Sequence, residues 1–133
     1  QGIANLQPQK VIPDLDVISF NSENKTLTEI AANKKVMFYF WSGTNKKQYQ
    51  EIFKRVAVLK EKKPDLELIG INIKTDFDQW KIILKNLGVD ESLQYHSNDF
   101  KELTEKLVLY PMNKAIITEN AVIVDGFSNI YYN

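Results

Sequence analysis

Positions 36–41 restrict the fold of this chain more than any other feature. The segment reads Val-Met-Phe-Tyr-Phe-Trp, so it is apolar throughout, rich in aromatic residues and free of polar alternation. A strand with this pattern is covered on both of its faces. The segment therefore predicts a central strand in a sheet that carries a layer on each side.

A helix and a second strand follow. The turn residues 42–45 precede a run in which apolar residues recur at helical spacing, and this predicts a helix over 46–62. Residues 66–73 are again mostly apolar and β-rich, which indicates a second interior strand. Strand, helix and strand in this order predict a right-handed βαβ unit with parallel strands.

The flanking segments predict a mixed α/β domain. A small hairpin is expected within 16–27, a helix between Asp76 and Gly88, and a short helix from Ser97 to Leu107. Two strands at 114–118 and 121–125 are joined by Glu119-Asn120 as an antiparallel hairpin. The order is β-α-β-α-α-β-β after a short β extension. We expect residues 1–10 to be a tail or linker remnant and residues 11–133 to form one domain.

Composition excludes several functions. The 133 residues include 17 Lys+Arg and 17 Asp+Glu, so no surplus of positive charge favours nucleic acid. The absence of cysteine excludes disulfides, thiolate nucleophiles and cysteine-held metals, and the single His96 excludes a multi-histidine site within one chain. The longest apolar run falls far short of the roughly 20 residues that span a bilayer. We expect no cofactor, no metal and no membrane insertion of this chain.

The predicted order, with a proline ahead of the last hairpin, resembles the thioredoxin fold. The resemblance is closer to the extracytoplasmic TlpA/ResA-type thiol-disulfide oxidoreductases, which are related to AhpC/TSA proteins, and it covers about residues 11–127. In that family a Phe-Trp pair ends the first core strand, as Phe40-Trp41 does here, and a Cys-x-x-Cys opens the following helix. Asn45 and Gln48 stand at the positions of the two cysteines, with Lys46 and Lys47 between them.

The resemblance implies a three-layer α/β/α sandwich with a mixed central sheet. It also implies a helix after the last hairpin, and because the sequence stops at Asn133 we expect that helix to be truncated or missing. In the family a cis-proline faces the dithiol, and Pro111 matches it. The candidate binding cleft therefore consists of Trp41, Thr44, Tyr110, Pro111 and Met112. Alternatively, Pro111 serves a tight turn and Trp41 belongs to the core.

The vestigial active-site positions Asn45, Lys46, Lys47 and Gln48 support little chemistry. Amide side chains cannot ionise as a thiol does or exchange electrons with a disulfide. The helix N-terminus, flanked by Lys46 and Lys47, could attract an anion or an acidic peptide. The alternative is that Thr44 or Asn45 caps the helix and both lysines are solvated.

Other polar residues favour structural roles. Asp76 and Asp78 fit the cap and first turn of a helix, where carboxylates are favoured, better than they fit a catalytic acid pair. His96 precedes an expected helix start, and a surface or capping role is expected for it rather than a role as general base.

The function expected from the sequence is a redox-inactive thioredoxin-like domain, not itself an enzyme. Its partners would be a peptide, a protein or another domain of a longer chain, or it would be purely structural. The alternative is part of a thiol-disulfide interchange protein whose cysteines lie outside this chain. The resemblance implies an extracytoplasmic or periplasmic location, and the start at Gln1 is compatible with removal of an upstream segment.

Overall fold

A computed structural model of the protein describes residues 10–97 and 114–129. The helical elements are α1 (Leu27–Ala31), α2 (Lys46–Lys62), α3 (Phe77–Leu87) and the short 3₁₀ turn η2 (Glu91–Leu93). The strands are β1 (Asp16–Ser19), β2 (Asn24–Thr26), β3 (Lys35–Ser42), β4 (Glu67–Ile73), β5 (Gln94–His96), β6 (Lys114–Glu119) and β7 (Val122–Asn129).

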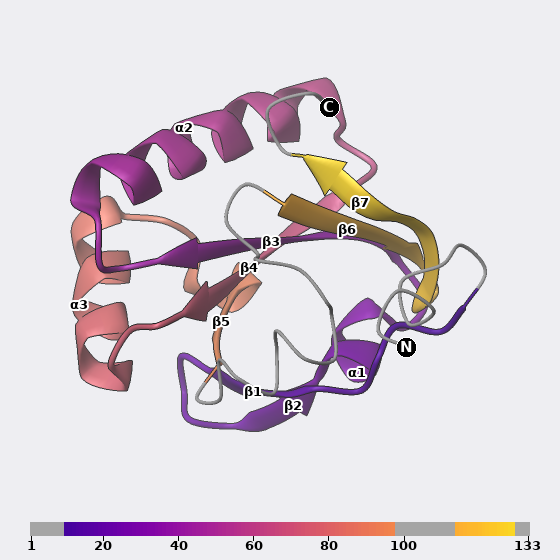
Figure 1. The fold of residues 1–133 in the computed structure, drawn as a ribbon, viewed down its shortest axis with the longest axis horizontal. Coiled ribbons are helices and arrows are strands. Elements are labelled where there is room, and N and C mark those ends of the chain that lie inside the picture. Colours follow the sequence, from indigo (N-terminus) through magenta and orange to yellow (C-terminus); the bar gives the residue numbers. More distant parts are fainter. Residues whose placement is uncertain (1–9, 98–113, 130–133) are drawn as a thin grey trace.

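The strands form one mixed sheet in the order β2-β1-β5-β4-β3-β6-β7 (Figure 1). Strand β3 pairs with β4 in parallel, and β4 pairs with β5 in parallel, whereas the remaining pairs are antiparallel. Because α2 connects β3 to β4, this part of the chain is the predicted βαβ unit. The carboxyl ends of β3, β4 and β5 consequently lie at one edge of the sheet.

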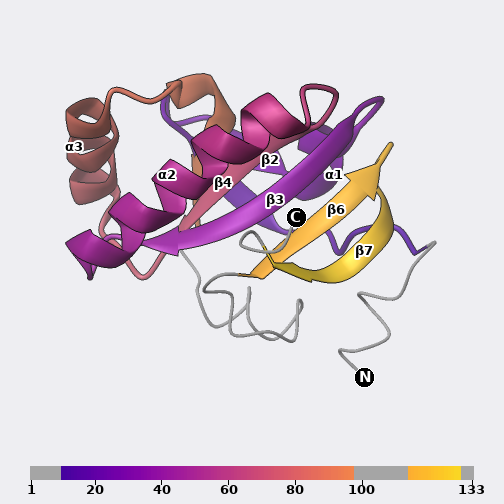
Figure 2. The ribbon, with the colours of Figure 1, turned by 90° about the horizontal axis from the view of Figure 1, so that it is seen from above.

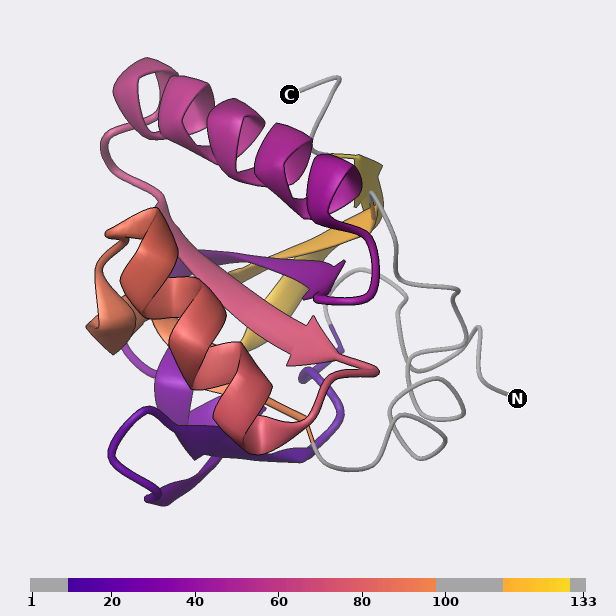
Figure 3. The same ribbon diagram turned by 90° about the vertical axis from the view of Figure 1, so that its left-hand side faces the viewer.

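Helices cover both faces of this sheet. Figure 1 shows α2 above the sheet and α1 below it, and Figure 2 shows α2 lying across β3 and β4. Figure 3 shows α3 beside β4 on the α2 side. The three-layer α/β/α sandwich expected from the sequence is confirmed.

Strand β3 is the centre of both core layers. Its side chains from Val36 to Ser42 are all buried, and successive residues enter opposite layers. Val36, Phe38 and Phe40 pack toward α1. Met37 and Tyr39 pack toward α2 and α3. The apolar run therefore has the two-sided burial that its lack of alternation predicted.

Local sequence signals set the limits of the two long helices. Helix α2 spans the predicted residues 46–62, and the Asn45 side chain accepts a hydrogen bond from the Gln48 N–H at its start. Asp76 caps α3 in the same way, as predicted, and accepts from the Gln79 N–H. Gly88 ends α3 with a left-handed φ of 68°, a conformation that glycine adopts without the steric cost of a Cβ.

The last hairpin departs slightly from the prediction. The two-residue turn is Asn120-Ala121 rather than Glu119-Asn120, because Glu119 still pairs with both Lys35 and Val122. Both turn residues have positive φ, 51° and 66°, as the tight turns of hairpins require. Strand β7 also runs longer than predicted, to Asn129.

Helix α1, strand β5 and the short turn η2 were not predicted. Helix α1 begins at Leu27, the last residue of the expected hairpin, and continues through residues for which no element was expected, while β5 lies just ahead of the helix expected from Ser97. Thr26 and Glu29 form a reciprocal capping box at the start of α1, and the Thr-x-x-Glu spacing is a sequence signal for that helix. Strand β5 has only three residues, too short for a periodic pattern.

The ends of the domain were predicted only in outline. The chain joins the sheet at Lys10, whose carbonyl accepts a 2.8 Å hydrogen bond from the Ile123 N–H, close to the expected start of order. The expected helix over 97–107, apart from Ser97, and the expected state of the C-terminal helix fall outside the described residues. Within the part of the chain that is described, no helix is long and apolar enough to cross a membrane.

Candidate functional site

The turn before α2 is held by its own side chains. The hydroxyl oxygens of Ser42 and Thr44 lie 2.9 Å apart, and the Thr44 N–H donates to Ser42 Oγ at 3.2 Å. The Gln48 N–H donates to Asn45 Oδ1 at 3.0 Å. Asn45 is therefore the cap of α2, one of the two residues proposed for that role, while Thr44 bonds back to Ser42.

The positions that correspond to the family's dithiol form the cap and first turn of α2. Asn45, Lys46 and Lys47 are exposed and Gln48 is half-buried. The first turn of α2 contains no acidic residue. The partial positive charge of the helix N-terminus and the two ammonium groups therefore add, and together they favour an anionic group at this end of the domain.

A buried polar network supports this turn from the neighbouring strand. The Gly43 N–H donates to Thr75 Oγ1 at 2.7 Å, and Asn72 Nδ2 donates to the same oxygen at 3.2 Å. Asn72 Nδ2 also lies 3.4 Å from the Trp41 carbonyl. Asn72 is fully buried. The network connects the loop after β3 to the loop after β4, so the turn before α2 is supported from the neighbouring strand.

His96 belongs to the same network, which corrects the expectation of a surface or capping role. The side chain is 1% exposed, and its Nδ1 lies 2.9 Å from Asn72 Oδ1. The imidazole stacks on Trp80 with ring centroids 5.3 Å apart and meets Phe77 edge-on at 5.7 Å. Because β5 places His96 beside Asn72 on β4, strand pairing carries the histidine into the core.

Sequence reasoning missed this network. The available signal was a polar residue, Asn72, inside an otherwise apolar strand end, followed three residues later by the hydroxyl of Thr75. Such a residue is buried only if its hydrogen bonds are satisfied. The partner, His96, comes from a strand that the sequence did not predict.

Trp41 is a core residue. Its side chain is 0% exposed and packs against Tyr49 and Phe53, with ring centroids 5.7 Å and 5.0 Å apart. Trp41 Nε1 donates to Gln94 Oε1 at 3.3 Å. The prediction that Trp41 lines a cleft is therefore corrected. The alternative, that Trp41 belongs to the core, describes its position beneath the turn.

Thr44 is exposed in the turn before α2. The remaining three members of the predicted cleft, Tyr110, Pro111 and Met112, lie outside the described residues. The cis-proline and its position relative to Asn45 stay predictions. Among residues 10–97 and 114–129, no group of three or more His, Asp or Glu side chains is placed to hold a metal ion. The described part of the site therefore offers a helix N-terminus, two lysines and neutral amides.

The arrangement of elements defines the class of protein. A parallel βαβ unit, helices on both faces of a mixed sheet and an antiparallel β6–β7 hairpin make up the thioredoxin-like fold, as the resemblance predicted. No protein-family model matches the sequence, and no curated protein matches it.

Solved structures agree with this fold at low sequence identity. A proposed thiol-disulfide oxidoreductase from Bacteroides vulgatus superposes with a TM-score of 0.74 at 22% identity, over 94% of this chain and 88% of its own. The thioredoxin domain of a thiol-disulfide oxidoreductase, also from Bacteroides vulgatus, superposes with a TM-score of 0.67 at 18% identity, over 90% of this chain and 87% of its own. A thiol peroxidase from Chromobacterium violaceum superposes with a TM-score of 0.71 at 10% identity, over 89% of this chain and 73% of its own. These similarities establish the thioredoxin-like fold of this chain.

Proposed function

We propose that this domain is a redox-inactive thioredoxin-like module that binds a peptide or protein partner at the end of the sheet where α2 begins. The observation that carries the proposal is the composition of the first turn of α2. Asn45 and Gln48 stand where the family resemblance places a dithiol, and the chain contains no cysteine. Thiol-disulfide exchange needs a thiolate, so the scaffold is retained without that reaction.

The charge at this end indicates the kind of partner. Lys46 and Lys47 are exposed at the positive end of the α2 dipole, and no acidic residue in that turn offsets them. An extended segment that carries Asp or Glu complements this surface. The backbone near Pro111 would receive the segment in strand-like fashion, as the family resemblance implies, and Trp41 supports the surface from below.

The test is an NMR titration of the ¹⁵N-labelled domain with an acidic decapeptide and with a control peptide in which Gln and Asn replace Glu and Asp. The acidic peptide should shift the amides of residues 43–48 and 110–112. The double variant Lys46→Glu/Lys47→Glu should weaken binding by at least tenfold. The control variant Lys62→Glu/Lys85→Glu makes the same charge change at the C-terminal ends of α2 and α3. It should leave the affinity for the acidic peptide within about twofold of wild type.

Two outcomes would overturn the binding proposal. In the first, shifts are confined to other surfaces. In the second, the two double variants weaken binding equally, which would make the interaction one of net charge alone rather than of this site.

A second candidate function is a docking domain within a longer thiol-disulfide interchange protein whose cysteines lie outside this chain. One of the similar structures is itself the thioredoxin domain of such an oxidoreductase, and another is a C-terminal domain. Weighing the native protein before and after thiol alkylation separates the two functions. A mass increase shows cysteines elsewhere in the chain and favours docking, whereas an unchanged mass favours the redox-inactive module.

We also propose an extracytoplasmic, periplasmic location, which rests on the resemblance to TlpA/ResA-type proteins. Cell fractionation with antibody detection tests it. Recovery of the protein with the periplasmic contents supports the proposal, and recovery with the cytoplasm contradicts it.

A further inference from the structure

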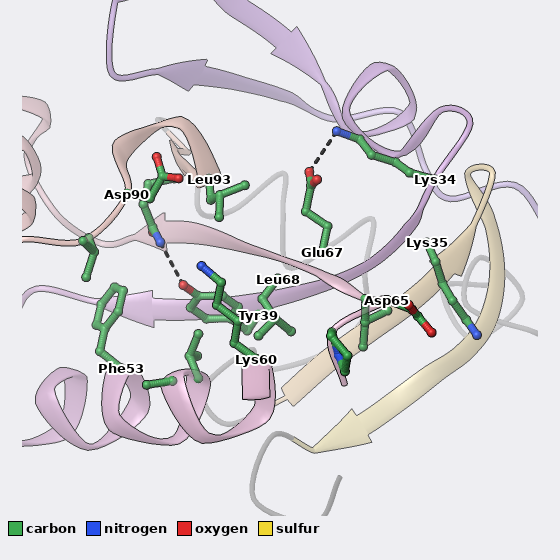
Figure 4. Close-up of a pocket in the computed structure, with 16 residues that line it drawn as sticks. Lys34, Lys35, Tyr39, Phe53, Lys60, Asp65, Glu67, Leu68, Asp90 and Leu93 are labelled. Atoms are coloured by element: carbon green, nitrogen blue, oxygen red, sulfur yellow. Dashed lines mark hydrogen bonds and ion pairs between the residues drawn. The ribbon is translucent and has the colours of Figure 1, made fainter. Parts of the chain in front are cut away.

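A pocket lies between the second half of α2, the start of β4 and the η2–β5 segment (Figure 4). Its volume is about 480 Å³, within the range of small-molecule sites. Phe53, Val56, Leu68, Val89 and Leu93 contribute apolar side chains to the wall. The pocket is separate from the surface proposed above, because that surface surrounds the first turn of the same helix.

The floor of the pocket is polar and buried. Tyr39 and Gln94 line it and are 1% and 4% exposed. Gln94 Nε2 donates to the Tyr39 hydroxyl at 2.8 Å (Figure 4). Gln94 Oε1 accepts from Trp41 Nε1 at 3.3 Å. Tyr39 and Trp41 thus orient the Gln94 amide, and the amide N–H donates to one lone pair of the Tyr39 oxygen.

The phenol retains a donor. A tyrosine hydroxyl has one O–H, and the bond from Gln94 uses only a lone pair of the oxygen. Burial raises the pKa of Tyr39 far above its ordinary value of 10.0, so the hydroxyl stays protonated at neutral pH. No acceptor for this O–H is found among residues 10–97 and 114–129. A buried donor without an acceptor costs free energy, and a ligand with an acceptor would recover it.

Gly70 makes room for this floor. A Cβ at position 70 would lie 2.8 Å from both Cζ and the hydroxyl oxygen of Tyr39, closer than atoms in contact approach each other. The missing side chain therefore lets the Tyr39–Gln94 pair lie against β4 in the middle of the sheet.

The charges around the pocket balance. Lys34 Nζ and Glu67 Oε1 pair at 2.8 Å. Hydrogen bonds from the Ser92 hydroxyl and N–H lower the pKa of Asp90, and the charge of Lys60 adds to this effect. Lys35 and Asp65, of opposite sign, also line the pocket. Since neither sign dominates, a charged ligand gains little here.

From the apolar walls and the buried donor, we propose that this pocket binds a small, uncharged aromatic molecule whose carbonyl oxygen accepts a hydrogen bond from the Tyr39 hydroxyl. The apolar walls enclose the ring, and the Tyr39–Gln94–Trp41 chain of hydrogen bonds orients the donor. The proposal concerns a binding site only and involves no reaction.

The test compares acetophenone with ethylbenzene, which has a similar shape but no acceptor. Binding is followed by ¹³C-methyl NMR on the intact domain. Acetophenone should shift the methyl signals of Val56, Leu68 and Leu93 and should bind more tightly than ethylbenzene. Tyr39→Phe should weaken the binding of acetophenone about five- to tenfold, the effect of one hydrogen bond, and should leave the affinity for ethylbenzene within about twofold.

A second pair of variants tests the location without altering the core. Ala57 lines the pocket from an exposed position on α2, and Ala57→Trp should abolish binding of both compounds. Val58→Trp makes a similar change at the neighbouring residue, which is 46% exposed and is not part of the lining, and should leave binding unchanged. Equal affinity for the two compounds, shifts only at other methyl groups, or loss of binding in both tryptophan variants would overturn the proposal.

Discussion

His96 Nδ1 lies 2.9 Å from Asn72 Oδ1 in the interior of the domain, at the point where β5 pairs with the end of β4. The same asparagine uses its Nδ2 to donate to Thr75 Oγ1. One buried side chain thus connects a neighbouring strand to the loop that supports the start of α2. The turn before α2 is therefore linked through Asn72 to the interior of the sheet.

Asn72→Ala should lower the free energy of unfolding by about 1–3 kcal/mol, because it leaves buried partners of the amide without their hydrogen bonds. Urea denaturation measures the loss. Asn86→Ala removes the same amide from an exposed position on α3 and should change stability by no more than about 0.5 kcal/mol. Equal effects of the two substitutions would show that the network does not stabilise the fold.

Tyr39 should make stability depend on pH in alkaline solution. Burial raises the pKa of its hydroxyl in the folded state, whereas the unfolded chain has the ordinary value of 10.0. Above pH 10 the unfolded state loses this proton and the folded state keeps it, so the free energy of unfolding falls as pH rises. The contribution is complete below pH 10 and decreases above it by about 1.4 kcal/mol per pH unit.

Tyr39→Phe removes this titration, so the free energy of unfolding of the wild type minus that of the variant should be constant well below pH 10 and should fall above pH 10. Urea denaturation at several pH values measures it. Parallel pH profiles for the two proteins would contradict the assignment.

Gly70→Ala should destabilise the domain by about 1–3 kcal/mol, the usual cost of an overpacked core. The new Cβ meets the amide oxygen of Gln94 and the ring of Tyr39, and both side chains are buried and cannot move aside freely. The same substitution in a Tyr39→Leu background should cost less, because the smaller side chain leaves space. A double-mutant cycle by thermal or urea unfolding measures the coupling. Additive effects would show that the two positions do not contact each other.

Asn45→Ala should cost about 1 kcal/mol, because the first turn of α2 loses the acceptor for the Gln48 N–H. Asn45→Ser retains a capping oxygen and should preserve most of the stability. Far-UV circular dichroism during urea unfolding compares the three proteins. If serine and alanine are equally destabilising, the capping bond contributes nothing and the role of Asn45 has to be sought in binding.

Short-range patterns predicted much of the fold. The apolar run of β3, the helical spacing of α2 and the capping residues Asn45 and Asp76 depend on neighbours within a few positions, and the structure confirms them. Helix α1 also had a local signal in Thr26 and Glu29, although its five residues are too few for a periodic pattern. The shift of the last turn to Asn120-Ala121 follows from strand pairing with β3, which acts between distant segments.

The candidate sites likewise contain features that the local sequence predicts and features that depend on the tertiary structure. Residue types alone exclude thiol chemistry, and local spacing places Asn45 and Gln48 in the first turn of a helix. The burial of His96 and the pocket floor depend on contacts between residues far apart in the chain. Tyr39 and Gln94 are 55 positions apart, and no local pattern relates them. Hydrogen bonds of this kind require β5 to be paired with β4, so the pairing of strands, not the chemistry of any one segment, determines which polar groups meet in the core.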